Sequence, residues 1–167
     1  NLEARIRSEL EHTKAGGDTT FWTVGETFDG TERIQAYITR EGRPQLDGQF
    51  DFPLYYAVNA AFGDWTIHLR DLESATASSL ASWGDTALMS SFLGNHDVMR
   101  FTSAAAEGWQ SSCDSDGVTP RNASWVDNDG IHANMRMAWT FLFTQPMVPL
   151  VYYGDELGMP GYSDPDN

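Results

Sequence analysis

The sequence predicts an α/β fold, because segments with strand character alternate with segments with helix character along most of its length. Strand segments are rich in β-branched and aromatic residues, and helix segments carry apolar residues every three or four positions. Such alternation is typical of parallel βαβ units. Polar residues also gather directly after the predicted strands, at the sheet edge where sites form in α/β proteins. The 167 residues suit about one domain, and no repeat or linker divides them.

The predicted elements are assigned in order along the chain. Leu2, Ile6 and Leu10 recur every four residues and indicate an amphipathic helix that ends at Gly16-Gly17. The other elements are a strand at 19–24, a helix at 31–40, a strand at 46–52, helices at 53–62 and 69–83, a strand at 86–92, a helix at 131–142 and a strand at 147–153. The polar segment at 94–130 is expected to be a long functional or flexible loop.

The composition excludes several classes of partner. A net charge of −14 gives the chain no electrostatic reason to bind nucleic acid, whose phosphates require lysine and arginine. No basic cluster suits anionic lipid, and no apolar run approaches the ~20 residues of a membrane helix. Cys113 is the only cysteine, so neither a disulfide within the chain nor a cysteine-based zinc site is expected.

Glu26 is the first candidate for chemistry. It follows an apolar strand segment that ends in Gly25. Apolar surroundings disfavour a charged carboxylate, so the pKa of Glu26 is expected to rise, as a general acid near neutral pH requires. The alternative is an ordinary glutamate in an exposed loop.

Three hydrogen-bonding residues, Asn95, His96 and Asp97, follow the strand predicted at 86–92. His96 can donate to hydroxyls and Asp97 can accept from them, so the pair suits a polyol such as a sugar, or the stabilisation of positive charge. The alternative is a turn whose Asn and Asp side chains bond their own backbone. A His-Asp metal site is a further alternative, but adjacent side chains of an extended chain point to opposite sides, and no third ligand is evident.

Aromatic and acidic residues mark the end of the last predicted strand. Tyr152 and Tyr153 close it, and Asp155 and Glu156 follow. Aromatic rings pack against the apolar faces of sugars, and carboxylates bind sugar hydroxyls. The alternative is a strand followed by a capped loop.

In this order, the three segments resemble the α-amylase family, glycoside hydrolase family thirteen. Residues 24–26 resemble the family's fifth-strand segment, 49–54 the sixth, 92–97 the seventh and 152–160 the eighth. The resemblance covers essentially the whole chain. It implies a partial TIM (β/α)8 barrel, strands five to eight with their helices. Residues 1–167 would then form the C-terminal half of the catalytic domain, without strands one to four and the last helix.

The resemblance also implies roles for individual residues in a retaining α-glycosidase that hydrolyses or transfers α-glucans such as starch and maltooligosaccharides. Glu26 would be the acid/base, and Asp97 would stabilise the oxocarbenium-like transition state. His96 would hydrogen-bond the sugar at the cleavage point. Further substrate contacts are expected from Asn95, Tyr153 and Asp164.

The family's nucleophile, an aspartate after the fourth strand, has no counterpart in the sequence. Covalent catalysis needs that group, so we expect the isolated chain to be inactive. It would require the N-terminal half of the barrel, in the same parent chain or as a partner. The segments that bind the family's frequent structural calcium are also absent, so no cofactor or metal is expected in this chain.

Two other interpretations stay open beside the glycosidase. One is a non-catalytic relative that keeps the barrel for sugar binding or scaffolding. The other is an unrelated α/β enzyme with a His-Asp metal site. Localisation is not fixed by the sequence, although export is compatible with the family's extracellular members.

Overall fold

A computed structural model describes residues 2–14, 21–84, 87–109 and 123–163. The helices are α1 (Leu2–Arg5), η1 (Ile6–Lys14, a π-helix), α2 (Thr31–Ile38), α3 (Phe52–Phe62), α4 (Leu69–Trp83), α5 (Phe101–Glu107), α6 (Asp129–Phe143) and η3 (Asp155–Leu157, a 3-10 helix). The strands are β1 (Val24–Gly25), β2 (Thr39–Arg40), β3 (Arg43–Pro44), β4 (Gly48–Gln49), β5 (Ser90–Phe92) and β6 (Val148–Leu150). Within the described ranges, every helix is too short or too polar to cross a bilayer.

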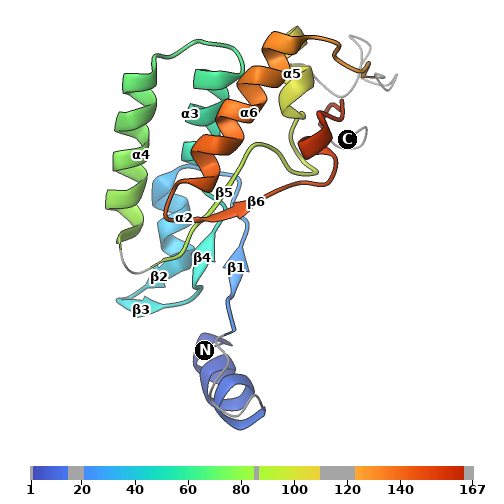
Figure 1. Cartoon of the computed structure of the whole chain (residues 1–167). Helices are drawn as coiled ribbons and strands as arrows, with labels where there is room; N and C mark the ends of the chain where they lie inside the picture. Colours follow the sequence, from blue (N-terminus) through green and yellow to red (C-terminus); the bar gives the residue numbers. More distant parts are fainter. Residues whose placement is uncertain (1, 15–20, 85–86, 110–122, 164–167) are drawn as a thin grey trace, which may run out of the picture.

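Four parallel strands lie next to one another in the order β1, β4, β5, β6, which is also their order along the chain (Figure 1). β1 pairs with β4, and β5 pairs with β6, both in parallel register. A parallel bridge between Phe50 and Ser90 joins the two pairs. β2 and β3 form a separate antiparallel hairpin. Parallel strands separated by helices confirm the predicted α/β class.

Each of the four strands is shorter than the sequence predicted. The prediction of a strand to residue 52 was wrong, because α3 begins at Phe52. The Asp51 carboxylate accepts the Leu54 backbone N–H at 3.1 Å, which is an N-cap that ends the strand. Of the other predicted strands, those at 19–24 and 86–92 keep only their C-terminal ends and the one at 147–153 keeps its first half, although Leu88 and Met89 still bond neighbouring strands through their backbone. Residues 19, 20 and 86 lie outside the described ranges.

A tight turn ends α2 two residues earlier than predicted. Thr39 and Arg40 leave the helix and pair with Arg43 and Pro44. The turn between them places Glu41 at φ 53° and Gly42 at φ 71°. A two-residue hairpin loop with a type I′ turn requires positive φ at both central positions.

The segment predicted as a loop at 94–130 contains regular structure. It holds the short helix α5 and the start of α6, and residues 110–122 within it lie outside the described ranges. The side chain of Asn128 accepts the backbone N–H groups of Gly130 and Ile131, so α6 begins with an N-cap.

Two large hydrophobic clusters form most of the core, and a small third cluster packs Met99 and Ala104 against Tyr162. The first lies between α3, α4, α5 and α6 and includes the fully buried Val58 and Leu142. The second packs α2, α3 and α4 against the strands and includes the fully buried Ile34 and Phe92. Figure 1 shows α3 standing beside both α4 and α6, as their contacts require. This packing fixes the position of the strand ends.

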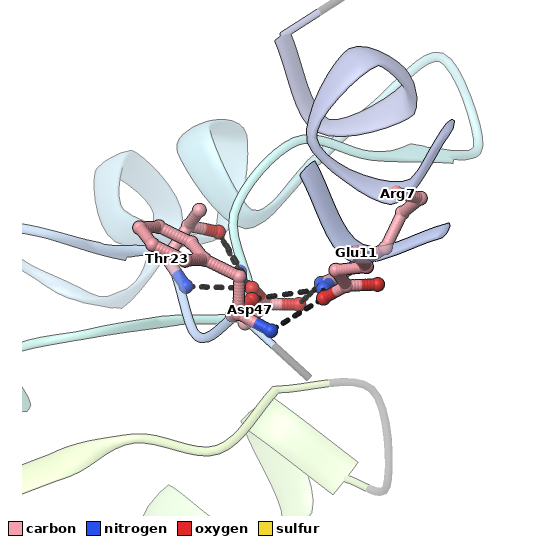
Figure 2. Close-up of polar contacts among 5 residues, drawn as sticks. Arg7, Glu11, Thr23 and Asp47 are labelled. Carbon is pink, nitrogen blue, oxygen red and sulfur yellow. Dashed lines mark hydrogen bonds and ion pairs between the residues drawn. The ribbon is translucent and has the colours of Figure 1, made fainter. Parts of the chain in front are cut away.

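The N-terminal helical segment is attached to the strands by a polar cluster (Figure 2). Arg7 on η1 forms ion pairs with Glu11 and with Asp47, which directly precedes β4. The backbone N–H and the hydroxyl of Thr23, beside β1, both donate to the same Asp47 carboxylate at 2.7 Å. Asp47 therefore joins the helical segment to the entry of the first two parallel strands.

Candidate active site

Four of the predicted site residues meet where two of the parallel strands end. Glu26 follows β1, and Asn95, His96 and Asp97 follow β5. The side-chain amide of Asn95 donates to Glu26 Oε1 at 2.8 Å, which joins residues 69 positions apart in the sequence. The register of the strands therefore brings two separately predicted segments into direct contact.

Asn95 is a buried residue that hydrogen-bonds to both parts of this site. It is only 3% exposed, whereas His96 and Asp97 are exposed. Its side-chain oxygen accepts the backbone N–H of Asp97 at 2.9 Å, while its amide holds Glu26. One buried side chain thus fixes both the turn and the carboxylate that faces it.

The turn places its side chains differently from the prediction. Adjacent residues of an extended chain point apart, but here the chain turns at His96 and Asp97, and His96 Nε2 lies 3.4 Å from Asp97 Oδ1. One ligating atom each from Glu26, His96 and Asp97 lie within 4.8 Å of one another. Glu26 is therefore a third candidate ligand beside the His-Asp pair, which was not evident from the sequence. Such a set of groups can grip a polyol or face a positive charge.

The pKa of Glu26 is raised above its ordinary value. Partial burial is the largest cause, and the negative charge of Asp97 adds to it. His96 and the hydrogen bond from Asn95 act in the opposite direction but do not cancel the rise. The direction confirms the expectation from sequence, although Asp97 contributes beside the desolvation. Glu26 itself stays open to solvent.

A second buried polar contact, missed from sequence, lies behind the turn. Arg100 is 1% exposed, and its Nη1 donates to Asp155 Oδ1 at 2.7 Å and to the backbone oxygen of Tyr153 at 2.8 Å. Burial raises the pKa of Asp155 by more than Arg100 lowers it, and the resulting pKa is about 6. Asp155 was expected to offer a carboxylate to sugar hydroxyls, but it is buried in this ion pair. The sequence feature that could have indicated this contact is an arginine within the otherwise apolar run at 98–101.

The comparison with known proteins identifies the family. Residues 3–166 match the family described as alpha amylase, catalytic domain. The chain belongs to this family. Its catalytic domain is a TIM barrel, so the α/β unit of this α-amylase-family chain is part of such a barrel.

Individual relatives agree with this assignment. The chain is 26% identical to alpha-amylase 1 of Schwanniomyces occidentalis over 93% of its length and 25% of that protein. It is 27% identical to a cyclomaltodextrin glucanotransferase of Bacillus licheniformis over 87% of its length and 17% of that protein. The structure of the Geobacillus thermoleovorans α-amylase complexed with acarbose superposes with a TM-score of 0.67 at 28% identity, covering 97% of this chain and 32% of that one.

The α-amylase-family chain thus spans about a quarter of the Schwanniomyces occidentalis protein and about a third of that solved structure.

Of the remaining predicted contacts, Tyr153 is 64% exposed, and its ring lies against that of Tyr152, with ring centroids 4.8 Å apart. Asp164 lies outside the described residues.

Proposed function

We propose that this chain is the C-terminal half of the catalytic barrel of a retaining glycosidase that acts on α-glucans. In this proposal β1, β4, β5 and β6 are the fifth to eighth barrel strands. The main support is the hydrogen bond between Asn95 and Glu26, which brings Glu26 close to His96 and Asp97 at the ends of β1 and β5. These residues lie in a chain that belongs to the α-amylase family. The order of the four parallel strands supports the same assignment.

Glu26 serves as the acid/base in this proposal. Its raised pKa lets it hold a proton at higher pH than an ordinary glutamate, and it donates that proton to the glycosidic oxygen. In the second step its carboxylate takes a proton from the water, or from the acceptor hydroxyl, that attacks the sugar. Both steps need Glu26 open to solvent and substrate, as it is.

Asp97 and His96 act on the sugar itself. The Asp97 carboxylate faces the positive charge that develops at the anomeric carbon and binds sugar hydroxyls. The His96 imidazole hydrogen-bonds the sugar at the cleavage point, and the exposed Tyr153 ring offers an apolar surface to it. Asn95 holds Glu26 and Asp97 in place, and Asp164 contributes a contact beyond the cleavage point.

The nucleophile comes from the other half of the barrel. A retaining enzyme needs a second carboxylate about 5–5.5 Å from the acid/base, which bonds to the anomeric carbon as the leaving group departs with the proton of Glu26. We assign that carboxylate to the segment that supplies strands one to four, in the same polypeptide or in a partner. The isolated chain is accordingly inactive. Hydrolysis and transfer share these steps, and one relative is named a cyclomaltodextrin glucanotransferase.

The test uses the assembled barrel, meaning this chain together with the segment that supplies the other strands. Maltooligosaccharide cleavage and acarbose binding are measured for wild type, Glu26→Gln and the control Glu32→Gln on the exposed face of α2. We expect wild type and the control to cleave, and Glu26→Gln to bind acarbose while its kcat falls by about 10²–10⁴-fold. Binding without cleavage by all three proteins would instead indicate a sugar-binding module, and no binding at all would refute the proposal.

A further inference from the structure

The segment 94–100 contains the turn at His96 and Asp97. Both ends of this segment contact the ion pair between Arg100 and Asp155. Arg100 closes the segment, and its guanidinium is bonded to Asp155 and to the backbone oxygen of Tyr153. Gly94 opens the segment, and a Cβ placed on it would lie 3.4 Å from Asp155 Oδ2. The Asp155 carboxylate therefore lies against the backbone directly before Asn95. His96 and Asp97 sit between these two contacts.

The arginine also faces the end of β6. Its guanidinium carbon lies 4.5 Å from the ring centre of Tyr152 and 5.1 Å from that of Tyr153. The backbone N–H of Arg100 donates to Gly161 at 3.0 Å, which adds a contact to the chain beyond η3. One side chain thus links the segment after β5 with the segment after β6.

Stability alone is a poor explanation for this pair. The side chains of Arg100 and Asp155 are 1% and 3% exposed, so both charges are removed from water. Arg100 Nε and Nη2 and Asp155 Oδ2 have no hydrogen-bond partner among the described residues. Desolvation of a buried ion pair commonly outweighs its attraction, and hydrophobic residues of similar size often replace such a pair without loss of stability. A role in specifying geometry explains the pair better.

We propose that Arg100 and Asp155 are positioning residues that fix the segment 94–100, and with it the Asp97 carboxylate, against Tyr153. The inference rests on the proposed function, since it assigns Asp97 to the transition state. Catalytic groups must be held within about 0.5 Å of their productive position. A displacement of about 1 Å lowers the rate by about a hundredfold even when its cause is remote.

The decisive variant replaces both partners with hydrophobic residues. In the assembled barrel, Arg100→Met/Asp155→Leu is compared with wild type, with Arg100→Lys and with the control Arg33→Met, which removes an exposed arginine paired with Asp29 at 3.6 Å. We expect the double variant to unfold near the wild-type temperature while its kcat falls by about tenfold to a hundredfold and its KM changes much less. Full kcat in a stable double variant would overturn the inference, because a merely structural pair predicts that result.

A second readout separates this inference from the proposed function. The ring signal of His96, assigned with His96→Gln, is followed by NMR in the same proteins without substrate. We expect the signal to shift in Arg100→Lys, which keeps the buried charge but loses the planar two-acceptor geometry, and to stay in place in Arg33→Met. An unchanged His96 signal in Arg100→Lys would overturn the positioning role. If wild type failed to cleave but the His96 signal moved, only the proposed function would fall.

Discussion

Glu26 is an exposed glutamate whose acidity depends on residues from another strand. Asp97 raises its pKa, while His96 and Asn95 lower it. Under the proposed mechanism the protonated form starts the reaction, so kcat/KM falls as the pH rises through the Glu26 pKa.

Replacing Asp97 by asparagine removes the negative charge that disfavours ionised Glu26, so we expect the Glu26 pKa to fall. A carbon-detected NMR titration of the Glu26 carboxyl in the assembled barrel measures this directly. Glu73→Gln on α4 removes a charge from a helix outside the site and is expected to leave the Glu26 pKa unchanged. An equal or higher pKa in Asp97→Asn would show that Asp97 does not act on Glu26.

Candidate residues were predictable from sequence, but their contacts were not. Glu26, His96 and Asp97 stood out because each follows a strand. Their meeting depends on strand register across 69 positions, which no local pattern encodes. Arg100 was missed because a single buried arginine does not change the periodicity of the sequence. Its partner Asp155 was expected to be exposed and to bind sugar hydroxyls.

At the scale of elements, a single carboxylate separates β4 from α3 and anchors α4. Asp51 is fully buried and caps α3 through the Leu54 backbone N–H. It also accepts Trp83 Nε1 at 2.9 Å and the hydroxyl of Ser79, both on α4. One buried side chain thus links the end of β4 to both α3 and α4.

Asp51→Ala is expected to destabilise the assembled barrel by about 2–4 kcal/mol, because it removes a helix cap together with the buried acceptor that Trp83 Nε1 and the Ser79 hydroxyl share. Asn128→Ala, which removes the exposed cap of α6, is expected to cost only about 1 kcal/mol. Urea unfolding measures both. Equal losses from the two variants would contradict a special role for the buried Asp51.

The order of elements followed from sequence, whereas their boundaries required tertiary information. Alternating strand and helix patterns correctly predicted parallel strands. Phe52 has strand propensity, but the Asp51 cap places it in a helix. α5 was missed because a helix of seven residues is too short to show periodicity.

At the scale of the whole molecule, β1 and β6 each have one strand neighbour among the described residues. Apolar side chains beside these edges are exposed, with Val24 at 40% and Val151 at 42%. An exposed strand edge is a template for pairing with another chain. The rest of a barrel would cover both edges.

The isolated chain is therefore expected to self-associate, and the complementary half of the barrel is expected to suppress this. Size-exclusion chromatography with light scattering measures the mass in each case. A monodisperse monomer of 167 residues that unfolds cooperatively would contradict the half-barrel account.

The central claim is that Glu26 is the acid/base of a covalent mechanism whose nucleophile lies in the other half. The most direct test incubates the assembled Glu26→Gln barrel with α-maltotriosyl fluoride and follows it by mass spectrometry. Fluoride leaves without a proton, so the first step survives, whereas the second step lacks its base. We expect fluoride release and a glycosyl adduct on the half that carries the nucleophile. An active wild type whose Glu26→Gln variant binds the fluoride but gives neither fluoride release nor an adduct would contradict the central claim.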